Sequence, residues 1–346
     1  MDNGSNSISQ RLPWVDVAKG ILILFVVLGH MEYYAQEFVG SHAYDFLHHI
    51  LFVYLPYYIP AFFVVTGFCS SFDVPFKTFL IKNFKTLLVP SVLIGFLVAR
   101  WIELFLYGGG LSIRNFMSIN YMELCMTGGH WFLTTLFLSK MVLYLQRKYF
   151  DYSPILVFAV YLLMMLLGAL LYNNNILPNI WYFKHVLLLL PFLYLGSCLR
   201  TNPKWVDKRY YIPSGIAMLL LAFIMPRFGL PYPYIVGAPG VFWGNFLLCV
   251  VMVMSGTLMV FSVSKKIQGC KPFEILGKHS LMIFLLHSAF LIFFLRITEH
   301  IGITENTNIG IRMITFLIIL SLSSIFPVFV DLWIDKHARY LKGKFY

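Results

Sequence analysis

The residues best suited to acid–base chemistry lie on one apolar segment near the start of the chain. Lys19 and His30 are eleven positions apart in this segment. In an α-helix that spacing is about three turns, so both side chains point the same way, about 16 Å apart along the axis. If Lys19 marks the membrane surface, His30 lies near the middle of the bilayer, where an ionisable group is costly and is a candidate functional site. An imidazole suits a general base that takes a proton from a hydroxyl. The structural alternative is a neutral histidine hydrogen-bonded to a neighbouring helix.

Three more charged residues are expected on the same side of the membrane as Lys19. Asp16 lies one turn before Lys19 on the same face, and we expect it to pair with that lysine or to cap the helix start. Lys82 and Lys85 are one turn apart, just before another apolar segment. Two cations on one face suit the phosphate groups of a soluble donor. Ordinary cytoplasmic loop charge is the alternative.

Charged residues also fall inside apolar segments. Arg100 and Glu103 are three positions apart and can satisfy each other within the membrane, which favours a structural ion pair over a substrate site. Lys140 has no acidic residue within a turn, so it needs a partner from another helix or a cavity. It is therefore a candidate for contact with substrate.

Two further histidines and a tryptophan complete the set of candidate substrate-binding residues. His130 and Trp131 lie where an apolar segment begins on the outer side, and an interfacial aromatic belt would place Trp131 there without any function. His287 lies about seven residues, roughly 10 Å, inside its own apolar segment and so approaches the depth of His30. Two deep histidines favour a shared polar cavity, although spacing alone does not show that they meet.

The elements that must position these residues are membrane helices. Of the 346 residues, 59% are hydrophobic and only 12% are charged, against about 25% charged residues in a soluble domain. Crossing a bilayer takes about 20 apolar residues. We predict an all-α polytopic membrane protein with about ten transmembrane helices, near residues 17–37, 49–71, 86–107, 131–149, 154–173, 181–200, 210–228, 242–264, 280–298 and 309–333.

Loop charges predict the orientation of these helices. Lysine and arginine concentrate in alternate loops, which the positive-inside rule assigns to the cytoplasm, and ten spans then leave both termini cytoplasmic. The first apolar stretch lacks a small-residue cleavage site and is expected to remain as the first span. We expect one transmembrane domain over residues 1–346, with a polar tail at 1–15 and a basic tail at 335–346, in the cytoplasmic (inner) cell membrane.

Composition also argues against some partners. The net charge of +11 comes from short loops and not from a continuous basic stripe, so we do not expect nucleic-acid binding. None of the five cysteines is spaced as CxxC, and no cysteine–histidine cluster has zinc spacing, so we expect no metal. The cysteines are expected to be small buried hydrophobes.

Taken together, these residues resemble the acyltransferase-3 family of membrane acyltransferases, in particular its short forms related to fucose 4-O-acetylase. The family's signature of a basic residue, ten residues and then a histidine is matched by Lys19 and His30. Weaker matches follow in the family's order: the basic pair before the third span, the Trp-Phe-Leu opening of the fourth, residues 191–196 and residues 276–287. They cover nearly the whole chain, and the ten-span count agrees.

The resemblance implies transfer of an acyl group, usually acetyl from acetyl-CoA, to a hydroxyl of a carbohydrate. It makes His30 catalytic, with Lys19 as its basic companion. The family's pair before the third span is usually arginine, and Lys82 and Lys85 lack the bidentate fork of arginine. Surface polysaccharides and lipid-linked glycans are typical acceptors, so polysaccharide-biosynthesis proteins are expected partners besides membrane lipids.

We therefore predict an integral membrane O-acyltransferase with acyl-CoA as the donor on the cytoplasmic side. His30 acts as general base or forms an acyl-histidine, Lys140 or His287 stabilises the oxyanion, and the acceptor sugar enters from the outer side. Two other classes stay open. A transporter of a sugar, glycan precursor or acyl donor would use His30 and His287 as a proton relay, but we find no internal repeat. A partner subunit of a polysaccharide synthase without activity of its own is the third class.

Overall fold

The computed structural model of the chain describes residues 12–39, 57–106, 124–126, 129–150, 152–227, 246–303 and 306–344. In this part of the chain all regular structure is helical, which confirms the predicted all-α class. The main helices are α1 (Pro13–Val39), a helix over Tyr57–Cys69, α3 (Phe76–Asn83), α4 (Arg100–Leu106), α6 (Trp131–Tyr149), α7 (Pro154–Asn173), α8 (Phe183–Thr201), α9 (Tyr211–Arg227), α10 (Phe246–Lys266), α11 (Lys271–Lys278), α12 (Ser280–His300) and α13 (Ile309–His337).

Each of the ten predicted spans coincides with helix over most of its described residues, and residues 49–56, 107, 228 and 242–245 of these spans lie outside the described part of the chain. Six helical stretches there are long and apolar enough to cross a membrane. They are Pro13–Met31, Phe76–Leu106, Pro154–Asn173, Ile180–Thr201, Ser280–His300 and Ile309–His337. The chain is thus a multi-pass membrane protein, while the count of ten spans and the cytoplasmic termini stay predictions.

The third span differs most from its prediction. It begins at Phe76, about ten residues earlier than expected, and the π-helical segments η1 (Phe84–Leu88) and η2 (Ser91–Ala99) join α3 to α4. Pro90 lies between the two π-helical segments and lacks the backbone N–H that a regular helix needs there. Long π-helical stretches are rare and are often found at functional sites.

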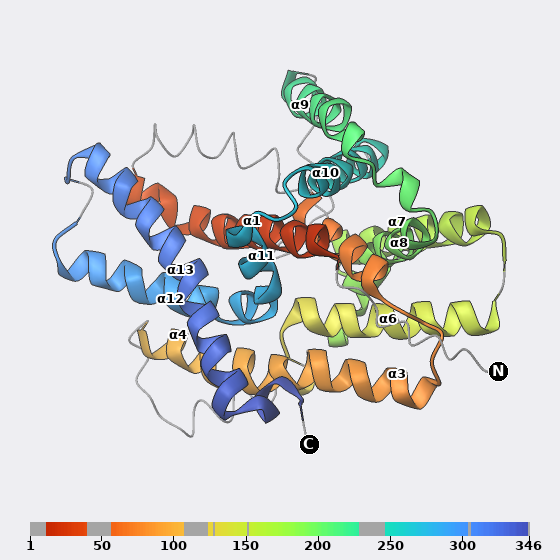
Figure 1. Cartoon of the computed structure of the whole chain (residues 1–346), viewed down its shortest axis with the longest axis horizontal. Helices are drawn as coiled ribbons and strands as arrows, with labels where there is room; N and C mark the ends of the chain where they lie inside the picture. The colour runs from red at the N-terminus through yellow and green to blue at the C-terminus, as the bar shows by residue number, and fades with distance from the viewer. Residues whose placement is uncertain are drawn as a thin grey trace.

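Helix α11 is an element that the sequence analysis did not predict. This eight-residue helix is too short to cross a bilayer. Its amphipathic pattern covers only about two helical turns, which is too few to distinguish a helix from a loop by periodicity. Figure 1 shows α11 lying against α1, with α12 and α13 on the same side of α1. Helices α7 and α8 pair with each other, and α6 packs against α8.

Helix α1 is the central element of the bundle. Its residues Val17, Ala18, Leu22, Ile23, Val26 and Val27 have no exposed surface. They fall on several sides of the helix, which is the pattern of a helix buried all round. Contacts with α10, α11, α12 and α13 account for this burial.

Two glycines allow α1 and α11 to touch through their backbones. A Cβ added to Gly20 of α1 would overlap the carbonyl oxygen of Phe273, and one added to Gly277 of α11 would overlap the carbonyl oxygen of Asp16. Small residues permit such close approach between membrane helices, and backbone atoms cannot move aside as a side chain can. We call these contacts the α1–α11 glycine seam.

We expect Gly277→Ala to lower the stability of the protein by about 2 kcal/mol, because the added methyl group forces the two backbones apart. The measurement is the thermal unfolding midpoint of the purified protein in detergent. Gly215→Ala in α9 is the matched control, because its nearest neighbour is the flexible Met259 Sδ at 3.3 Å. An equal shift for both variants would contradict the prediction.

The segment expected as a basic tail folds back onto the bundle. Asp331 of α13 is buried, and its Oδ2 accepts a hydrogen bond from His279 Nδ1 at 2.6 Å. Lys342 Nζ lies 2.6 Å from Oδ1 of Asp331 and 2.8 Å from Asp335, and Lys344 also pairs with Asp335. Gly343, with a φ of 71°, places its Cα against the carbonyl group of Lys85. These residues connect the end of the chain to the start of the third span.

Candidate functional site

The two deep histidines meet. The ring centroids of His30 on α1 and His287 on α12 are 4.6 Å apart, with the rings nearly perpendicular. His287 is 2% exposed, whereas His30 keeps an exposed surface although protein surrounds it on most sides. Two positive charges at this distance would repel each other strongly, so we expect the pair to hold at most one extra proton.

Backbone contacts fix which nitrogen of each ring carries the hydrogen. His30 Nδ1 lies 2.9 Å from the Val26 carbonyl oxygen, and His287 Nδ1 lies 3.0 and 2.9 Å from the Ile283 and Phe284 carbonyl oxygens. A carbonyl oxygen only accepts, so both Nδ1 atoms donate. In the neutral rings each Nε2 therefore carries a lone pair, which is the form required of a general base.

A third histidine lies beside this pair. The backbone N–H of His130 donates to Ser91 Oγ at 2.8 Å, and the His130 ring lies 4.6 Å from the ring of Phe284. The His130 side chain is within electrostatic range of both His30 and His287. Its Nδ1 is buried and has no hydrogen-bond partner among the described residues. We refer to His30, His130 and His287 as the histidine cluster.

Ser91 was not among the predicted site residues. It lies in η2, has no exposed surface and holds the main chain at His130. A serine in an apolar run gives no signal of such a contact, because its partner is 39 positions away. The π-helical geometry of the third span is what turns this residue towards the start of α6.

A cavity of ≈ 190 Å³ has Lys19 in its wall and is bounded towards the histidine cluster by Phe132 and Phe284. Lys19, Thr66 and Ser280 contribute polar groups to its wall, and Phe132 and Phe284 lie at the histidine side. The ring of Phe284 is 6.1 Å from His287 and 4.6 Å from His130. We call this space the inner cavity. Its small volume suits a narrow molecular arm and not a whole cofactor-sized ligand.

Lysines gather near Lys19, which lines the inner cavity. Lys140 of α6 lies within electrostatic range of Lys19 and Lys82, and its Nζ is 5.8 Å from the centroid of the Phe79 ring. We call Lys19, Lys82 and Lys140 the lysine cluster. Because Lys140 is ten residues beyond His130 on α6, it lies about 15 Å along the helix from the histidine cluster. The structure thus groups Lys140 with the predicted donor residues.

Cys69 lies near the same lysines. It is exposed, and Lys19, Lys140 and Arg200 are within electrostatic range of its thiol. Cys125 is also exposed. The prediction that the cysteines are buried hydrophobes is therefore wrong for these two residues; Cys69 is the last residue of the helix Tyr57–Cys69.

The other predicted site residues lie apart from the histidine cluster. Asp16 is buried at the start of α1 against Gly277. The predicted pairing of Arg100 with Glu103 is confirmed, with a separation of 3.6 Å between Nη1 and Oε2. The Trp131 ring lies 5.5 Å from the ring of the buried His185. The described residues contain no group of three or more histidine, cysteine or acidic side chains suited to a metal ion.

The long apolar helices define a multi-pass membrane protein, and His30 and His287 from two of these helices meet each other. Comparison with protein families matches residues 12–330 to an acyltransferase domain, so the chain belongs to the acyltransferase-3 family and is a membrane acyltransferase. Neither a curated protein nor a solved structure matches the chain.

Proposed function

We propose that this membrane acyltransferase is an O-acyltransferase that moves an acyl group, most simply acetyl, from acyl-CoA to a hydroxyl of a carbohydrate. The observation that supports this best is the contact of His30 with His287 beyond Phe284, a residue that lines the inner cavity, while Lys19 of the lysine cluster also lines it. A thioester that enters past the lysines would approach two imidazole rings whose Nε2 atoms carry lone pairs.

His30 is the general base in this proposal. The acceptor hydroxyl gives its proton to Nε2 of His30 as its oxygen attacks the thioester carbonyl carbon. The carbon–sulfur bond then breaks, and the leaving thiolate takes the proton back from Nε2. No other reactant is needed. His287, whose Nε2 also carries a lone pair, holds the His30 ring in place and shares the transient positive charge.

His130 is a better candidate for the oxyanion donor than the two residues expected from the sequence. Lys140 lies about 15 Å further along α6. The Nε2 of neutral His287 has no hydrogen to donate, because Nδ1 carries it. The buried Nδ1 of His130 has no partner among the described residues and is a suitable N–H donor to the tetrahedral oxyanion.

The lysine cluster would bind the phosphate groups of the donor. Lys140 lies within electrostatic range of both Lys19 and Lys82, and such like charges are unfavourable unless an anion joins them. The pyrophosphate of acyl-CoA is such an anion, and its recognition by point charges is typical of lysine. Lys85 contributes through its backbone position beside Gly343, which holds the start of the third span.

The acceptor would approach from the side on which α6 begins. His130 and Trp131 stand there, with His185 beside Trp131. Aromatic faces suit contact with sugar rings. With the charge-based orientation, this side is extracytoplasmic, so the donor and the acceptor reach His30 from opposite faces of the inner membrane.

A vesicle experiment separates this proposal from transport. Inverted membrane vesicles that contain the protein are given acetyl-CoA labelled in the acetyl group, and the label is followed into carbohydrate and into the vesicle lumen. Covalent transfer to carbohydrate that depends on His30 supports the proposal. Uptake of intact labelled donor without transfer would favour the transporter.

Cys69 provides a direct test of donor binding. We expect saturating coenzyme A to slow alkylation of Cys69 severalfold, because the lysine cluster lies within reach of this thiol. The measurement is the rate of maleimide labelling in a variant whose only remaining cysteine is Cys69. A variant that keeps only the exposed Cys125 is the control, and equal protection of both thiols would contradict the prediction.

A further inference from the structure

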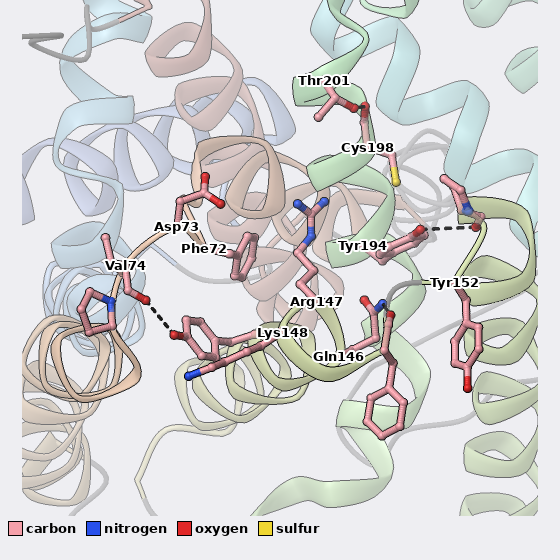
Figure 2. Close-up of a pocket in the computed structure, with 14 residues that line it drawn as sticks. Phe72, Asp73, Val74, Gln146, Arg147, Lys148, Tyr152, Tyr194, Cys198 and Thr201 are labelled. Atoms are coloured by element: carbon pink, nitrogen blue, oxygen red, sulfur yellow. Dashed lines mark hydrogen bonds between the residues drawn. The ribbon is translucent and has the colours of Figure 1, made fainter. Parts of the chain in front are cut away.

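A second cavity, larger than the inner cavity, lies in the described part of the chain. It has a volume of ≈ 690 Å³ and lies where α6 ends, α7 begins and α8 ends, together with the segment 72–75. Figure 2 shows Phe72, Asp73, Arg147 and Lys148 around it, with Tyr194 on the α8 side. We call it the outer cavity because it lies at the ends of helices and not within the bundle. In the orientation predicted from loop charge, it is on the cytoplasmic side. A volume of roughly 300–1,000 Å³ is typical of sites for small ligands.

Residues of α6 line both cavities. Leu136 lines the inner cavity, Lys140 follows four residues later, and Tyr144 and Lys148 of the outer cavity follow at the same spacing. Residues four apart are neighbours on a helix, so this row extends about 18 Å along α6 from Leu136 to Lys148 while turning about 120° around it. Phe79 lies beside the middle of this row, because the Phe79 ring centroid is 5.8 Å from Lys140 Nζ and 4.7 Å from the centroid of the Tyr144 ring.

The lining of the outer cavity has the groups that recognise a nucleotide. Tyr152 and Phe150 present exposed, nearly parallel rings, with 21° between the planes, on which a base can stack. Lys148 is exposed and supplies a cation for phosphate. Arg147 is held in place, because its Nη2 donates to Ser197 Oγ at 2.9 Å and its guanidinium lies 5.2 Å from the Phe72 ring centroid.

An unpaired acceptor adds a second, independent indication of a ligand. The amide nitrogen of Gln146 donates to the carbonyl oxygen of Phe150 at 2.9 Å, which fixes the orientation of the amide. Its Oε1 is then a buried acceptor without a partner among the described residues. Such an atom costs free energy unless a donor reaches it. The amino group of an adenine base or a ribose hydroxyl is a donor of the right kind.

We propose that the outer cavity binds the nucleotide end of the acyl-CoA donor, whose thioester arm then runs along α6 into the inner cavity. The inference rests on the proposed function. In it the base stacks on Tyr152, Lys148 binds the ribose phosphate, the lysine cluster binds the pyrophosphate, and the narrow arm reaches His30. The outer cavity thus selects the carrier of the acyl group and takes no part in the chemistry.

Full-length and truncated donors test this assignment. Lys148→Ala and Tyr152→Ala are each expected to raise KM for acetyl-CoA about tenfold, the loss of one charged or stacking contact, with little change in kcat. With S-acetylpantetheine, which lacks the nucleotide, the same variants should match the wild-type protein. Lys336→Ala is the matched control, because Lys336 is exposed and lines neither cavity.

Direct binding distinguishes failure of this inference from failure of the proposed function. Adenosine 3′,5′-bisphosphate should compete with coenzyme A in calorimetry, and Lys148→Ala should weaken both ligands. If the variants bind coenzyme A as tightly as wild type while His30 variants lose transfer, the nucleotide assignment is overturned and the proposed function stands. The assignment is also overturned if wild-type protein binds no coenzyme A. It is likewise overturned if the variants change only the binding of the protein to vesicles of anionic lipid.

Discussion

Replacement of His30 by glutamine is expected to reduce acyl transfer about 10³-fold, within the range typical for loss of a general base. Glutamine can keep a polar contact with the Val26 carbonyl oxygen, but it has no nitrogen that takes up a proton near neutral pH. The measurement is the rate of labelled acetyl transfer to carbohydrate in vesicles that contain equal amounts of folded protein.

The control for this variant is His337→Gln. His337 is an exposed histidine near the end of α13 and lies against the ring of Trp333, so its loss should leave transfer unchanged. His30→Gln should still bind coenzyme A, because the lysine cluster is intact. Transfer above a tenth of the wild-type rate in His30→Gln would remove His30 from the mechanism.

Replacement of Asp331 by alanine is expected to lower the stability by about 3 kcal/mol, as for other buried ion pairs that lose one partner. Asp331 is 4% exposed and contacts both His279 and Lys342. Its loss leaves His279 without an acceptor and releases the segment that seats Gly343 against Lys85. Thermal unfolding in detergent measures the effect.

Asp207 provides the comparison for this second variant. Its pair with Arg209 spans 3.1 Å at the surface, and an exposed pair of this kind contributes little to stability. We therefore expect Asp207→Asn to unfold at the wild-type temperature. If Asp331→Ala also did so, the contacts around Asp331 would not hold the end of the chain to the bundle.

Several candidate site residues could be predicted from the sequence, because the depth of a residue in the membrane follows from its position along a single helix. The eleven-residue spacing of Lys19 and His30 and the depth of His287 follow from helix geometry. The partners of these residues depend on how distant helices pair, which periodicity does not determine. The contact of His30 with His287 and the grouping of Lys140 with Lys19 and Lys82 therefore came only from the structure.

Two features carried no usable sequence signal. Helix α11 is short and amphipathic, so its hydrophobic pattern resembles that of a loop beside a span. The π-helical run that brings Ser91 to His130 is a departure from regular geometry within an otherwise ordinary apolar segment. The third span could thus be placed from composition, but its bend and its polar contact could not.

The α1–α11 glycine seam has a consequence for the order of events. A helix whose main chain touches its neighbour's main chain at Gly20 and Gly277 cannot slide or rock without breaking that contact. His30 is therefore expected to stay in place. In the mechanism that we propose, the acyl group alone crosses the membrane as it changes from sulfur to oxygen, and turnover depends on how often both reactants are present together at a fixed imidazole.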